Sequence, residues 1–119
     1  YNTWPKMGDK FFPEGLFFLE DKFWGVFENS IFIHFFHRGL AYLCVAFILV
    51  LSILHFKKID LIAQRNHFIA IITILFIQVV VGIYVVLSNV SISLGSLHQI
   101  VGSLLFASTF SYLFLIFRR

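Results

Sequence analysis

The chain has 119 residues, of which 60% are hydrophobic, 19% aromatic and 13% charged, with a formal net charge of +3. Soluble domains average about 45–50% apolar and about 25% charged residues, so this composition excludes an ordinary soluble domain and indicates an integral membrane protein or a part of one. The basic residues form no patch interleaved with aromatic residues in a polar setting, which argues against nucleic-acid binding. Cys44 is the only cysteine, so neither an internal disulfide nor a cysteine-based metal site can form.

Residues 1–30 are predicted to form a loop outside the membrane, with a short interfacial helix over 20–29. Four residues break any longer helix at its front: Pro5, Gly8, Pro13 and Gly15. The aromatic residues of 20–29 are typical of the membrane–water interface. Because the chain begins with Tyr1 rather than Met, we expect it to be part of a longer protein.

Three apolar segments are predicted to cross the membrane as helices, at about 31–56, 67–88 and 97–117. The uncharged core of the first, Gly39 to Phe56, has 18 residues and extends roughly 27 Å as a helix, close to the hydrocarbon thickness of a bilayer. The predicted fold class is therefore all-α, an integral membrane helical bundle. A fourth helix before Tyr1 would complete a four-helix bundle.

The positions of the basic residues predict the orientation of these helices. The loop 57–66 and the C-terminal pair Arg118–Arg119 together carry five Lys or Arg residues against one Asp. The positive-inside rule places them on the cytoplasmic side, or on the matrix side in a mitochondrion. The N-terminal loop and the loop 88–96 then face outward, and His37 and His98 lie at equal depth near the outer face.

His37 and His98 are the candidate metal ligands. A neutral imidazole is a good ligand for iron, and an ionisable group is costly to keep inside a membrane segment. Two imidazoles at one depth on two helices could hold a flat metallocofactor between them. Each is followed four residues later by a small residue, Ala41 or Gly102, which would leave room for a porphyrin. The alternative is ordinary helix packing, in which small residues allow close approach and the histidines are hydrogen-bonded.

Neighbouring polar residues extend this candidate site. Arg38 could bind a heme propionate in bidentate fashion, or it could reach for lipid headgroups. Gln99 could bond a ligand, orient its neighbour or contact another helix, so Arg38, Gln99 and Gly102 are the candidate cofactor-binding residues. His34 competes with His37, although a snorkelling or hydrogen-bonding role is expected for it nearer the interface.

Other polar residues are expected to have structural roles. Gln78 and Tyr84 in the second apolar segment could face a cavity, but the role expected for each is an interhelical hydrogen bond. His55 and His67 lie at the predicted cytoplasmic ends of the first two segments and are predicted to be interface residues.

A family resemblance runs through the whole chain. In chain order, its residues are Tyr1-Asn2-Thr3-Trp4-Pro5, Met7, Gly8, Pro13, Phe27-Glu28-Asn29, Phe35, His37-Arg38, Ala41-Tyr42, Gln78, Gly82, Leu97-His98-Gln99 and Gly102. In order and spacing the chain resembles the heme A synthases. The most specific part is the run Asn-Thr-Trp-Pro followed by His-Arg and then His-Gln.

The resemblance implies eight transmembrane helices in two similar four-helix halves, of which this chain resembles the second without its first helix. It implies an oxidoreductase that oxidises a ring methyl of heme O to the formyl group of heme A for cytochrome oxidase assembly. By motif, the second half holds heme b through His37 and His98. The half that handles the substrate is absent, so we expect this chain alone to bind heme b without turnover. The resemblance identifies no catalytic residue in this chain.

The resemblance also implies partners and a location. The partners are the substrate heme O, the N-terminal half of the same protein, heme O synthase and other cytochrome oxidase assembly proteins, and membrane lipid. The loops lack the cysteine pair of some bacterial members, which is similar to the alphaproteobacterial and mitochondrial branch. The implied location is the bacterial cytoplasmic (inner) membrane or the mitochondrial inner membrane. His34 stands where the family has Gln, which leaves a ligand swap with His37 open.

Two other functions stay open on the residues alone. A membrane cytochrome b electron-transfer subunit also carries paired histidines at equal depth, but two pairs spanning both leaflets would favour it, and one pair is visible. A non-enzymatic helical membrane subunit with structural histidines is the other alternative. A heme absorbance spectrum separates this alternative from the two heme proteins.

Overall fold

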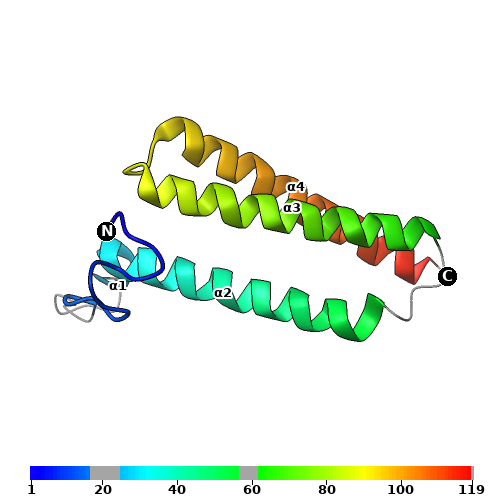
Figure 1. The fold of residues 1–119 in the computed structure, drawn as a ribbon, viewed down its shortest axis with the longest axis horizontal. Coiled ribbons are helices and arrows are strands. Elements are labelled where there is room, and N and C mark those ends of the chain that lie inside the picture. Colours follow the sequence, from blue (N-terminus) through cyan, green and yellow to red (C-terminus); the bar gives the residue numbers. More distant parts are fainter. Residues whose placement is uncertain (17–24, 57–61, 119) are drawn as a thin grey trace. The chain divides into compact units, whose positions relative to one another are not determined.

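The described part of the chain is helical. A computed structural model describes residues 1–16, 25–56 and 62–118, and within these ranges it contains no strand beyond one isolated bridge between Met7 and Lys10. The predicted all-α class is confirmed (Figure 1). The helices are α1 (Gly25–Glu28), α2 (Ser30–His55), α3 (Ile62–Leu87) and α4 (Ile92–Phe117).

The three predicted membrane-spanning helices are present as α2, α3 and α4, each 26 residues long. At about 1.5 Å per residue each extends about 39 Å, more than the roughly 30 Å hydrocarbon thickness of a bilayer. All three are long and apolar enough to cross a membrane.

Two of these helices begin five residues earlier than predicted. α3 starts at Ile62 rather than 67, and α4 starts at Ile92 rather than 97. The prediction followed hydropathy, whereas backbone hydrogen bonding continues through polar and small residues at a helix end. The predicted loop at 88–96 is therefore wrong at 92–96. The chain reverses within 88–91, where Asn89 and Val90 have positive φ values of 57° and 60°.

The short helix expected over 20–29 is present in part, as α1. Residues 17–24 and 57–61 lie outside the described residues. The predictions made for them, including the basic residues Lys57 and Lys58, are therefore not addressed by the structure.

The chain divides into two compact units, Tyr1–Leu49 and Val50–Arg119. In the first unit, Asn29 caps α2. Its Oδ1 accepts hydrogen bonds from the backbone N–H groups of Ile31 at 3.0 Å and Phe32 at 3.2 Å. Its Nδ2 donates to the Gly15 carbonyl at 3.1 Å. One side chain thus accepts hydrogen bonds from backbone N–H groups at the start of α2 and fastens the N-terminal segment, residues 1–16, to this helix.

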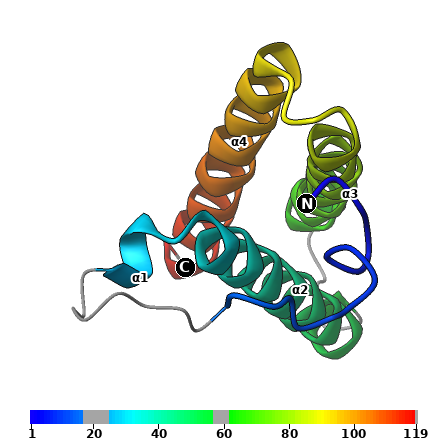
Figure 2. The same ribbon diagram turned by 90° about the vertical axis from the view of Figure 1, so that its left-hand side faces the viewer.

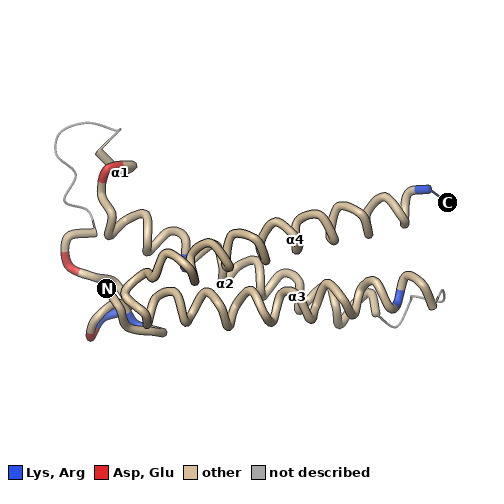
Figure 3. The backbone as a smooth tube through the Cα atoms, turned by 90° about the horizontal axis from the view of Figure 1, so that it is seen from above, with Lys and Arg blue, Asp and Glu red and all other residues tan. Residues whose placement is uncertain are grey.

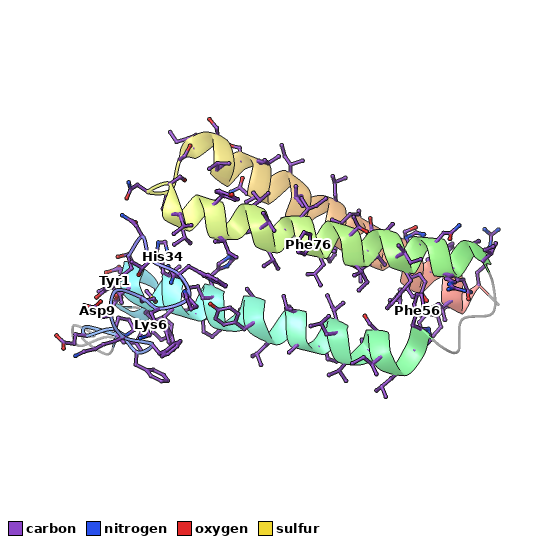
Figure 4. All side chains as sticks on the ribbon, in the orientation of Figure 1. Tyr1, Lys6, Asp9, His34, Phe56 and Phe76 are labelled. Carbon is purple, nitrogen blue, oxygen red and sulfur yellow. The ribbon has the colours of Figure 1, made fainter. Side chains whose placement is uncertain are left out.

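In the second unit, α3 and α4 lie side by side and antiparallel, joined by the turn at 88–91 (Figure 2). Phe68, Ile71 and Tyr112 are buried at the centre of a cluster between them. Phe56, labelled in Figure 4, packs on Phe68 with ring centroids 6.1 Å apart. Most other large apolar side chains of both helices are exposed, as expected for surfaces that face lipid or further helices.

Several polar side chains of the long helices are hydrogen-bonded within their own helix, as an apolar environment requires. Three hydroxyls donate to the carbonyl four residues earlier in their own helix: Thr73 to Ile69, Ser103 to Gln99, and Thr109 to Leu105. No Lys, Arg, Asp or Glu occurs between Arg65 and Arg118, and these two lie at the ends of the helices (Figure 3). Such satisfaction within the helix is what a bilayer requires, since its core supplies no hydrogen-bonding solvent.

Candidate functional site

His98 lies in the contact between α4 and α3. Its side chain is half-buried, and its Nε2 lies 3.3 Å from Nε2 of Gln78, at hydrogen-bond distance. The ring lies against the backbone of Gly82, where an added Cβ would be 2.9 Å from His98 Cε1. Real Cβ atoms essentially never approach so closely, so His98 can occupy this position only because residue 82 is glycine.

Gln78 in turn lies against Gly102. A Cβ at Gly102 would be 3.0 Å from Nε2 of Gln78. Each helix therefore contributes one large polar side chain and one glycine four residues away, and in the antiparallel pair each polar side chain faces the glycine of the other helix. We call Gln78, Gly82, His98 and Gly102 the polar seam. The predicted interhelical hydrogen bond of Gln78 is present in it.

Oε1 of Gln78 is buried and has no hydrogen-bond partner among the described residues. The two ends of a carboxamide differ only in which atom is oxygen, so a half-turn of the amide would present Oε1 to the His98 ring instead of Nε2. In either orientation the amide pairs with an imidazole nitrogen. The orientation selects whether that nitrogen accepts or donates the hydrogen bond.

His37 lies on α2 in the first unit, and its side chain is exposed. His34, three residues earlier, is exposed as well. His37 belongs to the first unit and His98 to the second. Gln99, next to His98 on α4, is exposed, and its backbone carbonyl accepts the hydrogen bond from Ser103.

Arg38 fastens the N-terminal segment to α2. Its Nη1 donates to the carbonyls of Thr3 at 2.9 Å and Lys6 at 3.2 Å, and its Nη2 donates to the carbonyl of Tyr1 at 3.2 Å. Tyr1, Lys6 and His34 lie together at this end of α2 (Figure 4). Nε of Arg38 is buried with no hydrogen-bond partner in the described ranges.

The N-terminal segment also has internal hydrogen bonds. Thr3 Oγ1 donates to the Lys6 carbonyl at 2.9 Å and accepts from the Gly8 N–H at 2.7 Å. Gly8 has a φ of +68°, a backbone conformation that favours glycine. These bonds give the segment a defined shape in which its carbonyls converge on the Arg38 guanidinium.

The partner of His67 does not follow from the sequence pattern. His67 Nε2 donates to the Ser108 carbonyl on α4 at 3.0 Å, and its ring lies 5.7 Å from that of Tyr112. It was predicted to be an interface residue because it lies at the polar end of its segment. Hydropathy indicates the depth of a residue but not the direction in which its side chain points.

Within the described ranges, no group of three or more His, Cys, Asp or Glu residues could hold a metal ion. A heme with two axial histidines needs no such group, because its four equatorial nitrogens come from the porphyrin.

Comparison with known proteins gives a consistent result. The model of a family described as cytochrome oxidase assembly protein matches residues 1–110. The chain is 36% identical to a heme A synthase of Pelagibacter ubique over 113 residues, which cover 92% of this chain and 32% of that protein. It is 30% identical to a heme A synthase of Wolbachia pipientis wMel over 113 residues, covering 95% and 30%.

A heme A synthase of Bartonella henselae is 36% identical over 103 residues, covering 83% of this chain and 28% of that protein. The chain thus spans between 28 and 32% of the length of these curated relatives. No solved structure matches it.

The Arg38 contacts predict that Arg38→Gln loosens the N-terminal segment. The change removes charged donors from three carbonyls, and each such bond contributes about 1.5–3 kcal/mol when well formed. If the free energy of local opening of the N-terminal segment falls by the contribution of one such bond, cleavage at Lys6 and Lys10 becomes about ten- to a hundredfold faster. The measurement is the rate of cleavage by a lysine-specific protease. Arg65→Gln is the matched control, because Arg65 contacts Phe56 in the other unit. Equal rates for the parent and Arg38→Gln would contradict this account.

Proposed function

The chain belongs to the cytochrome oxidase assembly protein family that contains the heme A synthases, and on this basis we propose that it is the cofactor-binding C-terminal part of a heme A synthase. The full-length enzyme oxidises a ring methyl of heme O to the formyl group of heme A for cytochrome oxidase. This part holds heme b through His37 and His98. Since the chain spans between 28 and 32% of its relatives, we expect turnover to need the rest of the protein. Heme O synthase and other assembly proteins are the proposed partners.

The observation that carries this proposal is the matching position of the two histidines on their helices. Consecutive membrane spans alternate in direction, so α2 and α4 enter the membrane from the same face. His37 follows the first residue of α2, Ser30, by seven positions (30 to 37), and His98 follows the first residue of α4, Ile92, by six (92 to 98). A helix rises about 1.5 Å per residue, so the two positions differ by about 1.5 Å along their own helices. On helices that begin at the same membrane face, such positions are the donor arrangement of a bis-histidine heme.

In the structure the Gln78 amide occupies Nε2 of His98 and Nδ1 is buried against α3, so binding of heme by His98 requires the ring to turn out of this contact. A neutral imidazole can be kept at this depth at lower cost than a charged group. When bound, heme b would supply a one-electron redox centre. The role of the chain is to hold that centre at a fixed position below the membrane surface.

Arg38, Gln99 and Gly102 complete the proposed site. Arg38 binds a heme propionate through the N–H groups that the N-terminal segment does not use, and its partnerless, buried Nε supports this role. Gln99 lies beside His98 on an exposed face of α4, where it can meet the cofactor or another helix. Gly102 provides clearance one turn from His98, and in the structure the Gln78 side chain lies against it.

We propose that the chain lies in the bacterial inner membrane, or the mitochondrial inner membrane, with the His37–His98 level near the outer face. Arg65 at the start of α3 and Arg118 at the end of α4 support this orientation, because both lie at the face opposite the N-terminal segment if all three helices cross. The turn at 88–91 and residues 1–16 would then be outside.

Axial ligation predicts a specific pattern in the full-length enzyme. His37→Ala and His98→Ala should each abolish the low-spin heme absorbance, because either change leaves the iron without one strong ligand. His34→Ala is the matched control and should keep the spectrum. Absorbance spectra of the purified variants, at equal protein concentration, give the result. Loss of the signal in His34→Ala with retention in His37→Ala would assign the ligand to His34 instead.

The orientation predicts opposite labelling of two exposed positions. In a background without other reactive cysteines, including Cys44→Ser, an impermeant maleimide added outside the cell should label Ile92→Cys at the start of α4. It should label Asn66→Cys, near the start of α3, only after the membrane is opened. Labelling of position 66 from outside intact cells would reverse the orientation.

A further inference from the structure

The contact with α3 encloses both nitrogens of the His98 ring. Nε2 lies 3.3 Å from Nε2 of Gln78, at hydrogen-bond distance, and Nδ1 is buried. An added Cβ at Gly82 would be 2.9 Å from Cε1 of the ring, 3.4 Å from Nδ1 and 3.7 Å from Nε2, so one edge of the ring faces the α3 backbone. We call this position of the ring, between Gln78 and Gly82, the seated position.

Neither tautomer of the seated ring offers a lone pair to iron. If the Gln78 amide donates to Nε2, the lone pair of Nε2 is used and Nδ1 carries the proton. If the amide is turned by half a turn, Nε2 carries the proton and donates to Oε1 of Gln78. The lone pair is then on Nδ1, which is buried against α3. The seated position and ligation of iron by His98 therefore exclude each other.

The polar seam favours the seated position. Gln78 lies on α3, an apolar helix for which the mean hydropathy reaches 2.8, and an amide in such surroundings is costly unless it is hydrogen-bonded. A Cβ at Gly102 would be 3.0 Å from Nε2 of Gln78, whereas a Cβ at Gly95, earlier on α4, would have no atom within 4 Å. The close contact is thus local to the polar seam. The hydrogen bond between Gln78 and His98 exists only while the ring is seated.

We propose that Gln78 competes with heme for His98. The amide retains the ring in the seated position, and His98 becomes able to bind iron after the ring rotates away from Gly82 and this hydrogen bond breaks. The inference rests on the proposed function, in which His98 is an axial ligand of heme b. Gln78 thus opposes heme binding, although its side chain contacts a heme ligand.

The competition has a measurable size. Only molecules in which the ring has left the seated position can bind heme through His98, and the apparent Kd equals the intrinsic Kd divided by the fraction of such molecules. A hydrogen bond between neutral groups typically shifts an equilibrium by about two- to tenfold. While the seated ring predominates, loss of the Gln78 bond therefore raises this fraction, and tightens heme binding, by about the same factor.

The test titrates the full-length enzyme, prepared without heme, with ferric heme b, and follows the low-spin absorbance for the Kd and the rate of binding. Gln78→Leu keeps the approximate size of the side chain and removes the hydrogen bond, so we expect a Kd about two- to tenfold lower than that of the parent. The rate should level off at high heme concentration, because the ring leaves the seated position before iron binds, and the plateau should be higher in the variant. If Gln78 only packed the two helices together, its loss would weaken heme binding instead.

A second variant acts on the seated ring by a different means. Gly82→Ala places a Cβ 2.9 Å from Cε1 of the ring, which disfavours the seated position and leaves the hydrogen-bonding groups unchanged. We expect tighter and faster heme binding here as well. The matched controls are Gln64→Leu, at a buried glutamine 14 residues away on α3 (78 − 64), and Gly95→Ala, where the added Cβ meets no atom. Both controls should bind heme as the parent does.

The outcomes separate this inference from the proposed function. If His98→Ala keeps the low-spin heme signal, His98 is not the ligand, and the proposed function and the competition both fail. If His98→Ala loses the signal while Gln78→Leu binds heme with the Kd of the parent or more weakly, the competition alone is overturned. If Gln78→Leu does not fold, Gly82→Ala decides by the same criterion. Equally tighter binding in the two controls would also overturn the competition, because the effect would not be local to the polar seam.

Discussion

The contact between the His98 ring and α3 is the constraint on which the arrangement of the second unit depends. An imidazole can lie between two membrane helices only where one backbone lacks a side chain and a polar group meets the ring nitrogen. Gly82 satisfies the first condition and Gln78 the second. Because these two residues are one helical turn apart, they fix the rotation and the register of α3 against α4 at this level. The apolar cluster around Phe68 and Tyr112 lies at the other end of the same helix pair. This cluster adds buried apolar area, but apolar contacts do little to fix the rotation of one helix against the other.

In the first unit, two side chains organise the start of α2. Asn29 satisfies the helix N–H groups and holds the Gly15 carbonyl, and Arg38 gathers three carbonyls of the N-terminal segment. Both residues belong to the motifs by which the chain resembles the heme A synthases, as does Thr3. Their shared role in this structure is to hold an irregular segment against a helix. Because His37 directly precedes Arg38, the contacts of Arg38 with the N-terminal segment also hold the backbone of α2 at His37.

Helix existence was predictable from the sequence because a long apolar run has few alternatives in a bilayer. The helix starts were less predictable, since Gln64 and Arg65 on α3 and Ser93 on α4 are helical despite weak hydropathy. The Gln78 hydrogen bond followed from the cost of burying an amide. Its partner could not be assigned, because that depends on the rotation of two helices about their axes. The role of Arg38 depends on where loop carbonyls converge, which no periodicity encodes. The spacing that pairs Gln78 with Gly82 and His98 with Gly102 was visible, but its antiparallel match required the fold.

The central claim is that His37 and His98 together ligate one heme, and pulsed EPR on the ferric full-length enzyme tests it most directly. With histidine labelled by ¹⁵N, the account predicts a low-spin signal with couplings from two histidine nitrogens bound to the iron. Substituting either residue should remove one of them. A high-spin signal, or coupling to one histidine nitrogen in the unsubstituted enzyme, would contradict the account.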